Sequence, residues 1–115
     1  MEGRRYTGIV MSGGKRAAQL GFPTANIPLE DDSVSGIFAG RVSVAGRVYD
    51  AVVYADRKRK LIEAHLFGFF GNLYGKDVAV VLLHKLREDR EFSGDGEMRA
   101  AIAADIAAAH AYFKK

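Results

Sequence analysis

The sequence contains no cysteine, which excludes disulfide bonds and zinc sites built on thiolates and is typical of a cytoplasmic protein. It also lacks any apolar run approaching the roughly 18 residues that a membrane-spanning helix needs. The N-terminal residues include no apolar segment of the kind that a secretory signal requires. We therefore expect a cytoplasmic protein with no membrane segment.

A large net charge is absent as well, since 17 basic and 14 acidic residues leave a formal charge of +3. Much of this excess lies in one basic run at residues 57–60. Such a run is typical of a solvated loop or strand tip, which is the interpretation we favour. The alternative is a patch for an anionic ligand, either nucleic acid or a polyphosphate. At 115 residues the chain has room for one core, so we expect a single domain over residues 1–115.

Proline is scarce, with two residues, whereas 13 glycines separate short stretches that are rich in β-branched residues. These stretches predict strands at residues 5–11, 36–44, 47–55, 61–69 and 77–86. Ala45 and Gly46 separate two of them, which predicts a hairpin with a tight turn. Residues 23–32 show no clean periodicity and are expected to form a loop.

The C-terminal segment changes to the spacing of a helix. Apolar residues recur every three or four positions from Glu97 to Phe113, as on one helical face. Asp95 is placed to cap the first turn, and Lys114 and Lys115 suit the negative end of the helix dipole. Several antiparallel strands followed by a helix indicate a mainly β protein of the α+β class. The simplest form is a small barrel or curled sheet with the helix laid across it.

Thr24 and Asn26 alternate along the chain, so in an extended segment their side chains point the same way. A hydroxyl and an amide oxygen are hard ligands that suit Mg²⁺, which keeps waters and substrate phosphates as its other ligands. On spacing alone, however, we favour the simpler interpretation that these side chains bond to their own backbone in a turn.

Glu63 and His65 lie in an otherwise apolar, strand-like run, on a face that also carries aromatic residues. A carboxylate in such surroundings should have a raised pKa, which suits a general base acting on a hydroxyl. An exposed glutamate on an edge strand is an equally good interpretation of Glu63. His65 is more simply a packed, hydrogen-bonded histidine than a catalyst.

Two further segments carry groups that can contact a ligand. Residues 8–15 run from a strand into a glycine-rich loop, whose backbone N–H groups can bind phosphates. A plain hairpin turn is favoured, because Lys15 is not followed by Ser or Thr as in a Walker A motif. Residues 86–92 hold five charges and end in Phe92, and a solvated loop is favoured over a lid that stacks on a planar ligand.

Taken in order, these segments resemble the riboflavin kinase family. The motifs that carry the resemblance are Leu-Gly-Phe-Pro-Thr-Ala-Asn at 20–26, Gly-Ile-Phe-Ala at 36–39, Glu-Ala-His-Leu at 63–66, Leu-Tyr-Gly at 73–75, Leu-Arg-x-x-x-x-Phe at 86–92 and Ile-x-x-Asp at 102–105. They cover nearly the whole chain in the order that the family shows.

The resemblance implies a six-stranded antiparallel Greek-key β-barrel with a C-terminal α-helix. It also implies a Mg²⁺-dependent transfer of the γ-phosphate of ATP to the ribityl 5′-hydroxyl of riboflavin, giving FMN and ADP. The adenylyltransferase domain of many bacterial relatives is missing, so we expect a stand-alone kinase or an excised domain. We also expect a monomer that binds no nucleic acid.

The same resemblance implies roles for individual residues. The Pro-Thr-Ala-Asn loop holds Mg²⁺-ATP in such enzymes, which makes Thr24 and Asn26 the metal and ATP ligands here. Glu63 becomes the general base. The remaining implied contacts are Gly13, Leu66 and Tyr74 on the ATP side, and Arg87, Arg90 and Phe92 on the flavin side.

Two departures from the family pattern keep a second hypothesis open. Ala17 and Ala18 stand where the family has Gly-Arg, and the connection at 56–60 is several residues shorter. Both favour, as an alternative, a catalytically weak relative that binds flavin or nucleotide. A small basic barrel that binds nucleic acid through residues 57–60 is a third hypothesis, weakened by the lack of an aromatic stacking platform beside that run. Retention of the base together with both metal ligands favours the kinase.

Overall fold

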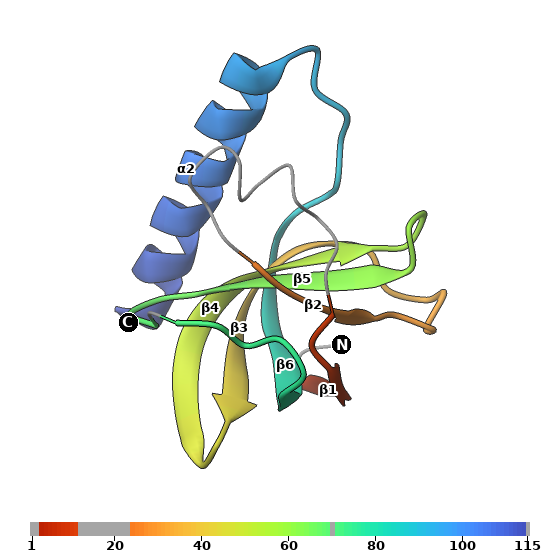
Figure 1. Ribbon diagram of the computed structural model, residues 1–115. Helices are drawn as coiled ribbons and strands as arrows, with labels where there is room; N and C mark the ends of the chain where they lie inside the picture. Colours follow the sequence, from red (N-terminus) through yellow and green to blue (C-terminus); the bar gives the residue numbers. More distant parts are fainter. Residues whose placement is uncertain (1–2, 12–23, 70, 115) are drawn as a thin grey trace.

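The computed structural model describes residues 3–11, 24–69 and 71–114 (Figure 1). The elements in these residues are the strands β1 (Arg4–Ile9), β2 (Ala25–Pro28), β3 (Gly36–Val44), β4 (Arg47–Asp56), β5 (Leu61–Leu66) and β6 (Asp77–Arg87), followed by the helix α2 (Asp95–Phe113). Neither this helix nor any other described segment offers a helical span long and apolar enough to cross a membrane.

The strands form one antiparallel sheet whose order, among the described residues, is β1-β6-β3-β4-β5-β2. The sheet curls until its two edge strands approach each other. Met11, just after β1, bridges to Asn26 of β2, and its backbone N–H donates to the Asn26 carbonyl at 2.9 Å. The fold is therefore a nearly closed antiparallel barrel with a C-terminal helix, which confirms the fold class expected from the sequence.

Side chains alternate between the inside of the barrel and the face that α2 covers. Ile62 and Ala64 of β5 belong to the main core inside the barrel, as do Val53 and Phe38. A second, smaller core lies between the sheet and the helix, where Ile37, Ala39 and Val52 pack against Ala109. The last turns of α2 are thereby fixed on the outer face of β3 and β4 (Figure 1).

The structure confirms the predicted hairpin between β3 and β4, and β3 covers the predicted residues 36–44. Ala45 and Gly46 both have positive φ, at 52° and 78°, as a two-residue turn with the twist of the flanking strands requires. This hairpin sets the register of two long strands, which pair from Gly36 with Ala55 to Val44 with Arg47. It places β4 firmly in the middle of the sheet.

The loop expected at residues 23–32 is wrong in part, because Ala25–Pro28 forms the strand β2. The strand was hidden because Ala25, Asn26 and Ile27 are all buried, so the usual alternation of polar and apolar residues is absent. Pro28 suits the end of an edge strand, where no partner needs its missing N–H. The result brings Asn26 directly beside β5.

The helix begins earlier than its apolar spacing predicts, and its cap differs from the expectation. Gly94, in extended backbone, is the N-cap residue, and Asp95 is the first helical residue. Asp95 and Glu97 still lie in the first turn, where carboxylates stabilise the positive end of the dipole. Glu97 also accepts a hydrogen bond from the backbone N–H of Ser93 at 2.8 Å, which satisfies one donor at the entry to the helix.

Candidate functional site

A row of paired residues crosses the sheet on its outer face. Asn26 of β2 lies opposite Glu63 of β5, which lies opposite Tyr54 of β4. Tyr54 in turn pairs with Ile37 of β3, and Ile37 with Arg87 of β6. Directly opposite residues in a sheet point to the same side. Two of the residues singled out from the sequence, Asn26 and Glu63, are therefore neighbours although the chain separates them by 37 positions.

Glu63 is buried, with 8% of its surface exposed, on a strand that lies between β4 and β2. This excludes the interpretation of Glu63 as an exposed glutamate on an edge strand. Burial raises the pKa of the Glu63 carboxyl, and the Arg59 guanidinium opposes that rise. Nη2 of Arg59 lies 3.0 Å from Oε2 of Glu63 but is not aligned as a hydrogen bond, and Oε2 has no hydrogen-bond partner among the described residues.

Thr24 and Asn26 point the same way, as their alternation predicts. The Thr24 hydroxyl donates a long hydrogen bond of 3.4 Å to Oδ1 of Asn26. Asn26 itself is 2% exposed. Two oxygens that bind one Mg²⁺ at right angles, each at about 2.1 Å, would be about 3.0 Å apart. A shift of a few tenths of an ångström would therefore let both oxygens bind one ion, so these residues fit Mg²⁺.

A cavity of about 350 Å³ opens beside Glu63, on the outer face of the barrel. Its floor is formed by Ile37, Tyr54 and Glu63, and its far walls come from residues 89–92 and from the first half of α2. The volume lies near the lower end of the range for small-molecule pockets. The described residues around it combine apolar surface with charges of both signs, as expected of a pocket that orients a mixed ligand.

The three residues predicted to contact flavin meet at one wall of this cavity. The Arg87 guanidinium makes two bonds to the Asp105 carboxylate, at 2.7 and 2.8 Å, which ties the end of β6 to α2. The Arg90 guanidinium lies over the Phe92 ring at 4.8 Å, and the Arg87 guanidinium lies 5.8 Å from the same ring. The segment at 86–92 is thus a structured wall, and not only a solvated loop.

The residues predicted for the ATP side are less closely gathered. Leu66 is buried in the main core, and Tyr74 is exposed with its backbone N–H bonded to the Asn72 side chain. Neither is among the described residues that line the cavity beside Glu63. Gly13 and the loop at 12–18 lie outside the described residues. His65 packs edge-on to Phe67, in keeping with the simpler interpretation of this histidine.

Tyr54 is a residue of this site that sequence reasoning missed. Its hydroxyl is buried and has no hydrogen-bond partner among the described residues. Burial raises the pKa of Tyr54, and the Asp105 charge adds to the rise. Once the pairing of β4 with β5 is known, Tyr54 falls directly opposite Glu63. The strand pattern of residues 47–55 alone does not distinguish it from a surface tyrosine.

The basic run at 57–60 forms the exposed turn between β4 and β5, as favoured from the sequence. Most of its cations are paired. The Arg57 guanidinium donates to the Asp32 carbonyl at 3.2 Å, Lys58 lies 3.6 Å from Glu91 and Arg59 contacts Asp56 as well as Glu63. These contacts reduce the positive charge that the run could offer to a nucleic acid backbone, although the run remains solvated.

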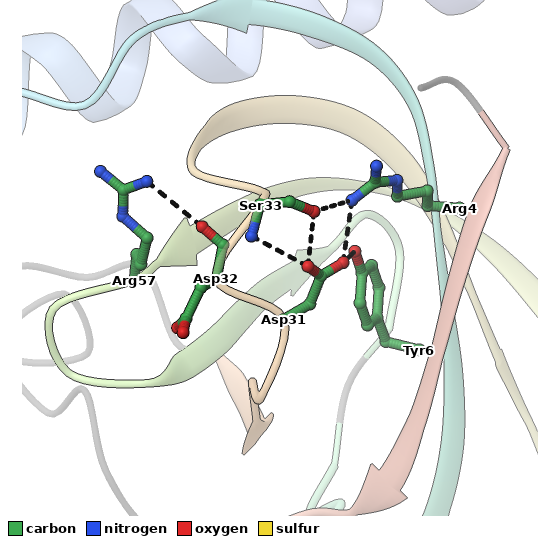
Figure 2. Close-up of polar contacts among 6 residues, drawn as sticks. All are labelled: Arg4, Tyr6, Asp31, Asp32, Ser33 and Arg57. Carbon is green, nitrogen blue, oxygen red and sulfur yellow. Dashed lines mark hydrogen bonds and ion pairs between the residues drawn. The ribbon is translucent and has the colours of Figure 1, made fainter.

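A second polar cluster, which we call the Asp31 cluster, lies away from the cavity and consists of Arg4, Tyr6, Asp31 and Ser33 (Figure 2). Oδ2 of Asp31 accepts hydrogen bonds from the Arg4 guanidinium and the Tyr6 hydroxyl, at 2.8 and 2.7 Å. Oδ1 accepts from the Ser33 backbone and hydroxyl. The cluster ties β1 to the segment after β2 and leaves no carboxylate oxygen unpartnered.

The fold and the site together define the class of protein. It is a small antiparallel barrel with a ligand-sized cavity on its outer face. A buried carboxylate lines the cavity, and the side-chain oxygens of Thr24 and Asn26 lie at the start of the neighbouring strand. A model of the flavokinase family, described as riboflavin kinase, matches residues 3–113. The chain belongs to the riboflavin kinase family.

Individual relatives agree with this assignment. The chain is 38% identical over 117 residues to the bifunctional riboflavin kinase/FMN adenylyltransferase of Pseudomonas fluorescens, matching 93% of this chain and 37% of that protein. It thus spans little more than a third of the length of that relative. A riboflavin kinase structure from Trypanosoma brucei shares the fold, with a TM-score of 0.69 and 24% identity, covering all of this chain and 82% of that one.

A second solved structure also shares the fold. It is described as a macrolide-efflux protein from Streptococcus pneumoniae and superposes with a TM-score of 0.80 and 23% identity, covering 94% of this chain and 38% of that one. At this identity the likeness concerns the fold alone. The barrel with its C-terminal helix therefore recurs as one part of a longer chain.

Proposed function

We propose that this chain transfers the γ-phosphoryl group of ATP to the ribityl 5′-hydroxyl of riboflavin, giving FMN and ADP. The family supports this activity, and the observation that carries it is the placement of Glu63. A buried carboxylate lies beside the two oxygen donors of Thr24 and Asn26, and it lines a cavity of ligand size. A hydroxyl bound in that cavity would be close to both a base and a bound phosphate.

Each group has a part in the proposed reaction. Glu63 accepts the proton of the attacking hydroxyl, and its raised pKa makes it a better base than an exposed carboxylate. Arg90 and Phe92 offer a flat, cationic surface to the flavin ring, while Arg87 is held in place by Asp105. Positioning and charge stabilisation supply most of the rate enhancement in phosphoryl transfer.

Thr24 and Asn26 would hold Mg²⁺ together with the phosphates of ATP. When bound, the ion would neutralise charge on the transferring phosphates. We expect Thr24→Ala or Asn26→Ala to raise the Mg²⁺ concentration needed for half-maximal activity, since one ligand is lost in each. Titration of activity with Mg²⁺ measures this shift. Unchanged titration curves would remove both residues from the metal site.

The remaining expectations belong to the same proposal: a single domain over residues 1–115, a monomer, a cytoplasmic location, and ATP and riboflavin as the molecules it binds. The test is an assay of the purified protein with riboflavin, ATP and Mg²⁺, in which chromatography separates riboflavin from FMN. We expect FMN that depends on both substrates and is lost in Glu63→Gln. Binding of riboflavin or ATP without FMN would favour the catalytically weak relative.

A further inference from the structure

Arg59 is held against the candidate base by a second carboxylate. Its Nε donates to Oδ2 of Asp56 at 2.7 Å, and its backbone N–H donates to Oδ1 of the same residue at 3.1 Å. The turn at 57–60 therefore closes on Asp56, at the end of β4, and directs the guanidinium toward β5. There Nη2 lies 3.0 Å from Oε2 of Glu63. The guanidinium bridges two carboxylates at the edge of the cavity.

This arrangement encloses the oxygen that a base would use. Oε2 of Glu63 is buried next to the guanidinium and, within the part of the chain that the structure describes, has no aligned hydrogen bond. A purely structural ion pair is expected to satisfy its buried oxygens, because an unpartnered one costs about 1–3 kcal/mol. The Arg59 side chain is also 51% exposed, so it can rotate away from Glu63 without unpacking the core. The contact with Glu63 is therefore a poor anchor, whereas the two bonds to Asp56 form a good one.

The distribution of charge in the site indicates how the Arg59 guanidinium would move during the reaction. One cation, Arg59, faces the two carboxylates of Asp56 and Glu63, so this group of three carries one net negative charge at the edge of the cavity. When Glu63 accepts a proton it becomes neutral and no longer attracts the cation. At the same moment negative charge develops on the oxygens of the transferring phosphoryl group and on the leaving group, where a guanidinium with free N–H donors stabilises it.

We propose that Arg59 is a catalytic residue of the phosphoryl transfer: anchored on Asp56, its guanidinium pairs with Glu63 in this structure and contacts the transferred phosphoryl group in the transition state. This inference rests on the proposed function. The 5′-oxygen of riboflavin bonds to the γ-phosphorus while the bond from that phosphorus to the bridging oxygen of ATP breaks. Its electron pair leaves with ADP, the hydroxyl proton moves to Glu63, and Arg59 keeps its protons.

The other described cations around the cavity are committed elsewhere. Arg87 is bound by both oxygens of Asp105, and Arg90 lies over the Phe92 ring. Lys58 pairs loosely with Glu91 and is almost fully exposed. Of the cations in the described part of the chain, Arg59 makes the contact with Glu63. Among the described cations, Arg59 is therefore the best placed to leave Glu63 when that carboxylate is protonated and to contact the negatively charged phosphoryl group.

The test compares Arg59→Gln with Arg57→Gln, which removes the same charge from the same turn. Among the described residues the Arg57 guanidinium donates to the Asp32 carbonyl, and it does not line the cavity. We expect Arg59→Gln to lower kcat about 100- to 1,000-fold, with KM for both substrates within about threefold. Arg57→Gln should keep kcat within about twofold. In Arg59→Ala, free guanidinium ions at non-denaturing concentration should restore part of kcat, which a structural defect would not allow.

The outcomes separate the two proposals. If the wild-type protein forms FMN and Arg59→Gln keeps kcat within about threefold, the role of Arg59 is overturned and the kinase stands. Equal losses in Arg59→Gln and Arg57→Gln would also overturn it, because the effect would then be general electrostatics. Loss of kcat without guanidinium rescue in a variant that melts well below the wild type would assign Arg59 a structural role. A wild-type protein that forms no FMN overturns both.

Discussion

Two clusters of the molecule use the same kinds of residues to opposite effect. The Asp31 cluster and the group around Glu63 each combine a carboxylate, an arginine and a tyrosine. In the first, every carboxylate oxygen accepts well-aligned hydrogen bonds, and the Tyr6 hydroxyl is one of the donors (Figure 2). In the second, Oε2 of Glu63 and the Tyr54 hydroxyl are buried without a hydrogen-bond partner among the described residues.

The contrast is the reverse of what stability alone favours. Hydrogen bonds from Ser33 and Tyr6 hold the pKa of Asp31 well below its usual range, although that carboxylate is partly exposed. Burial raises the pKa of Glu63, a carboxylate that needs hydrogen bonds more than Asp31 does but has fewer of them among the described residues. A buried, poorly satisfied carboxylate at a cavity is typical of a functional site, where the unsatisfied capacity serves a ligand. This contrast supports the proposed roles, in which the Asp31 cluster stabilises the fold and Glu63 acts as the general base.

Among the substitutions that test this contrast, Glu63→Gln should have the largest effect. We expect turnover to fall roughly 1,000-fold, within the range that a positioned general base contributes, and thermal stability to stay equal or rise because a buried charge is removed. Asp31→Asn should do the opposite, keeping turnover within about twofold while lowering Tm. Rates of FMN formation and melting curves of both variants measure this. Loss of stability without loss of rate in Glu63→Gln would reverse the two assignments.

Asp105 tests whether burial alone, or burial together with missing hydrogen bonds, distinguishes a functional carboxylate. Asp105 is 3% exposed, so it is buried like Glu63. Both of its carboxylate oxygens accept hydrogen bonds from Arg87, so its hydrogen bonding is complete like that of Asp31. We expect Asp105→Asn to lower the free energy of unfolding by about 3 kcal/mol, because Arg87 loses its charged partner.

The matched control for this prediction is Asp50→Asn, which breaks the half-exposed pair of Arg41 with Asp50. That variant should change the free energy of unfolding by less than about 0.5 kcal/mol. Denaturant unfolding measures both. Equal effects in the two variants would show that burial of the Arg87–Asp105 pair contributes nothing to the fold.

The two tyrosines sharpen the comparison at the level of a single hydroxyl. Tyr6→Phe removes a hydrogen bond of 2.7 Å to Asp31 and should cost about 1 kcal/mol. Tyr54→Phe removes a buried hydroxyl that has no partner among the described residues, and should stabilise the protein by about 1 kcal/mol. Tm values with and without riboflavin measure this. A destabilised Tyr54→Phe protein would mean that the hydroxyl is satisfied in solution.

Much of this contrast lies beyond what the sequence can predict. The hairpin of β3 and β4, the helix and the resemblance to the riboflavin kinase family follow from local spacing and motifs. The strand β2 does not, because its residues are buried on both faces and lose the period of two. Without β2 there is no reason to place Asn26 beside Glu63. The contact of Arg59 with Glu63 likewise depends on a turn whose sequence reads as a solvated basic run.

The smallest expected effect is the pH dependence of the Asp31 cluster. The pKa of Asp31 is depressed in the folded protein by its hydrogen bonds, so the cluster stabilises the fold fully above the unfolded value of about 3.9. Below that value the unfolded chain binds a proton that the folded one resists, and this stability is lost as pH falls. Hence the Tm advantage of wild type over Asp31→Asn should be constant from pH 7 to pH 5 and shrink toward pH 3. Melting curves at these three pH values measure it, and an advantage that grows on acidification would contradict the ordering of the two clusters, since the carboxylate of Asp31 would then be the strained one.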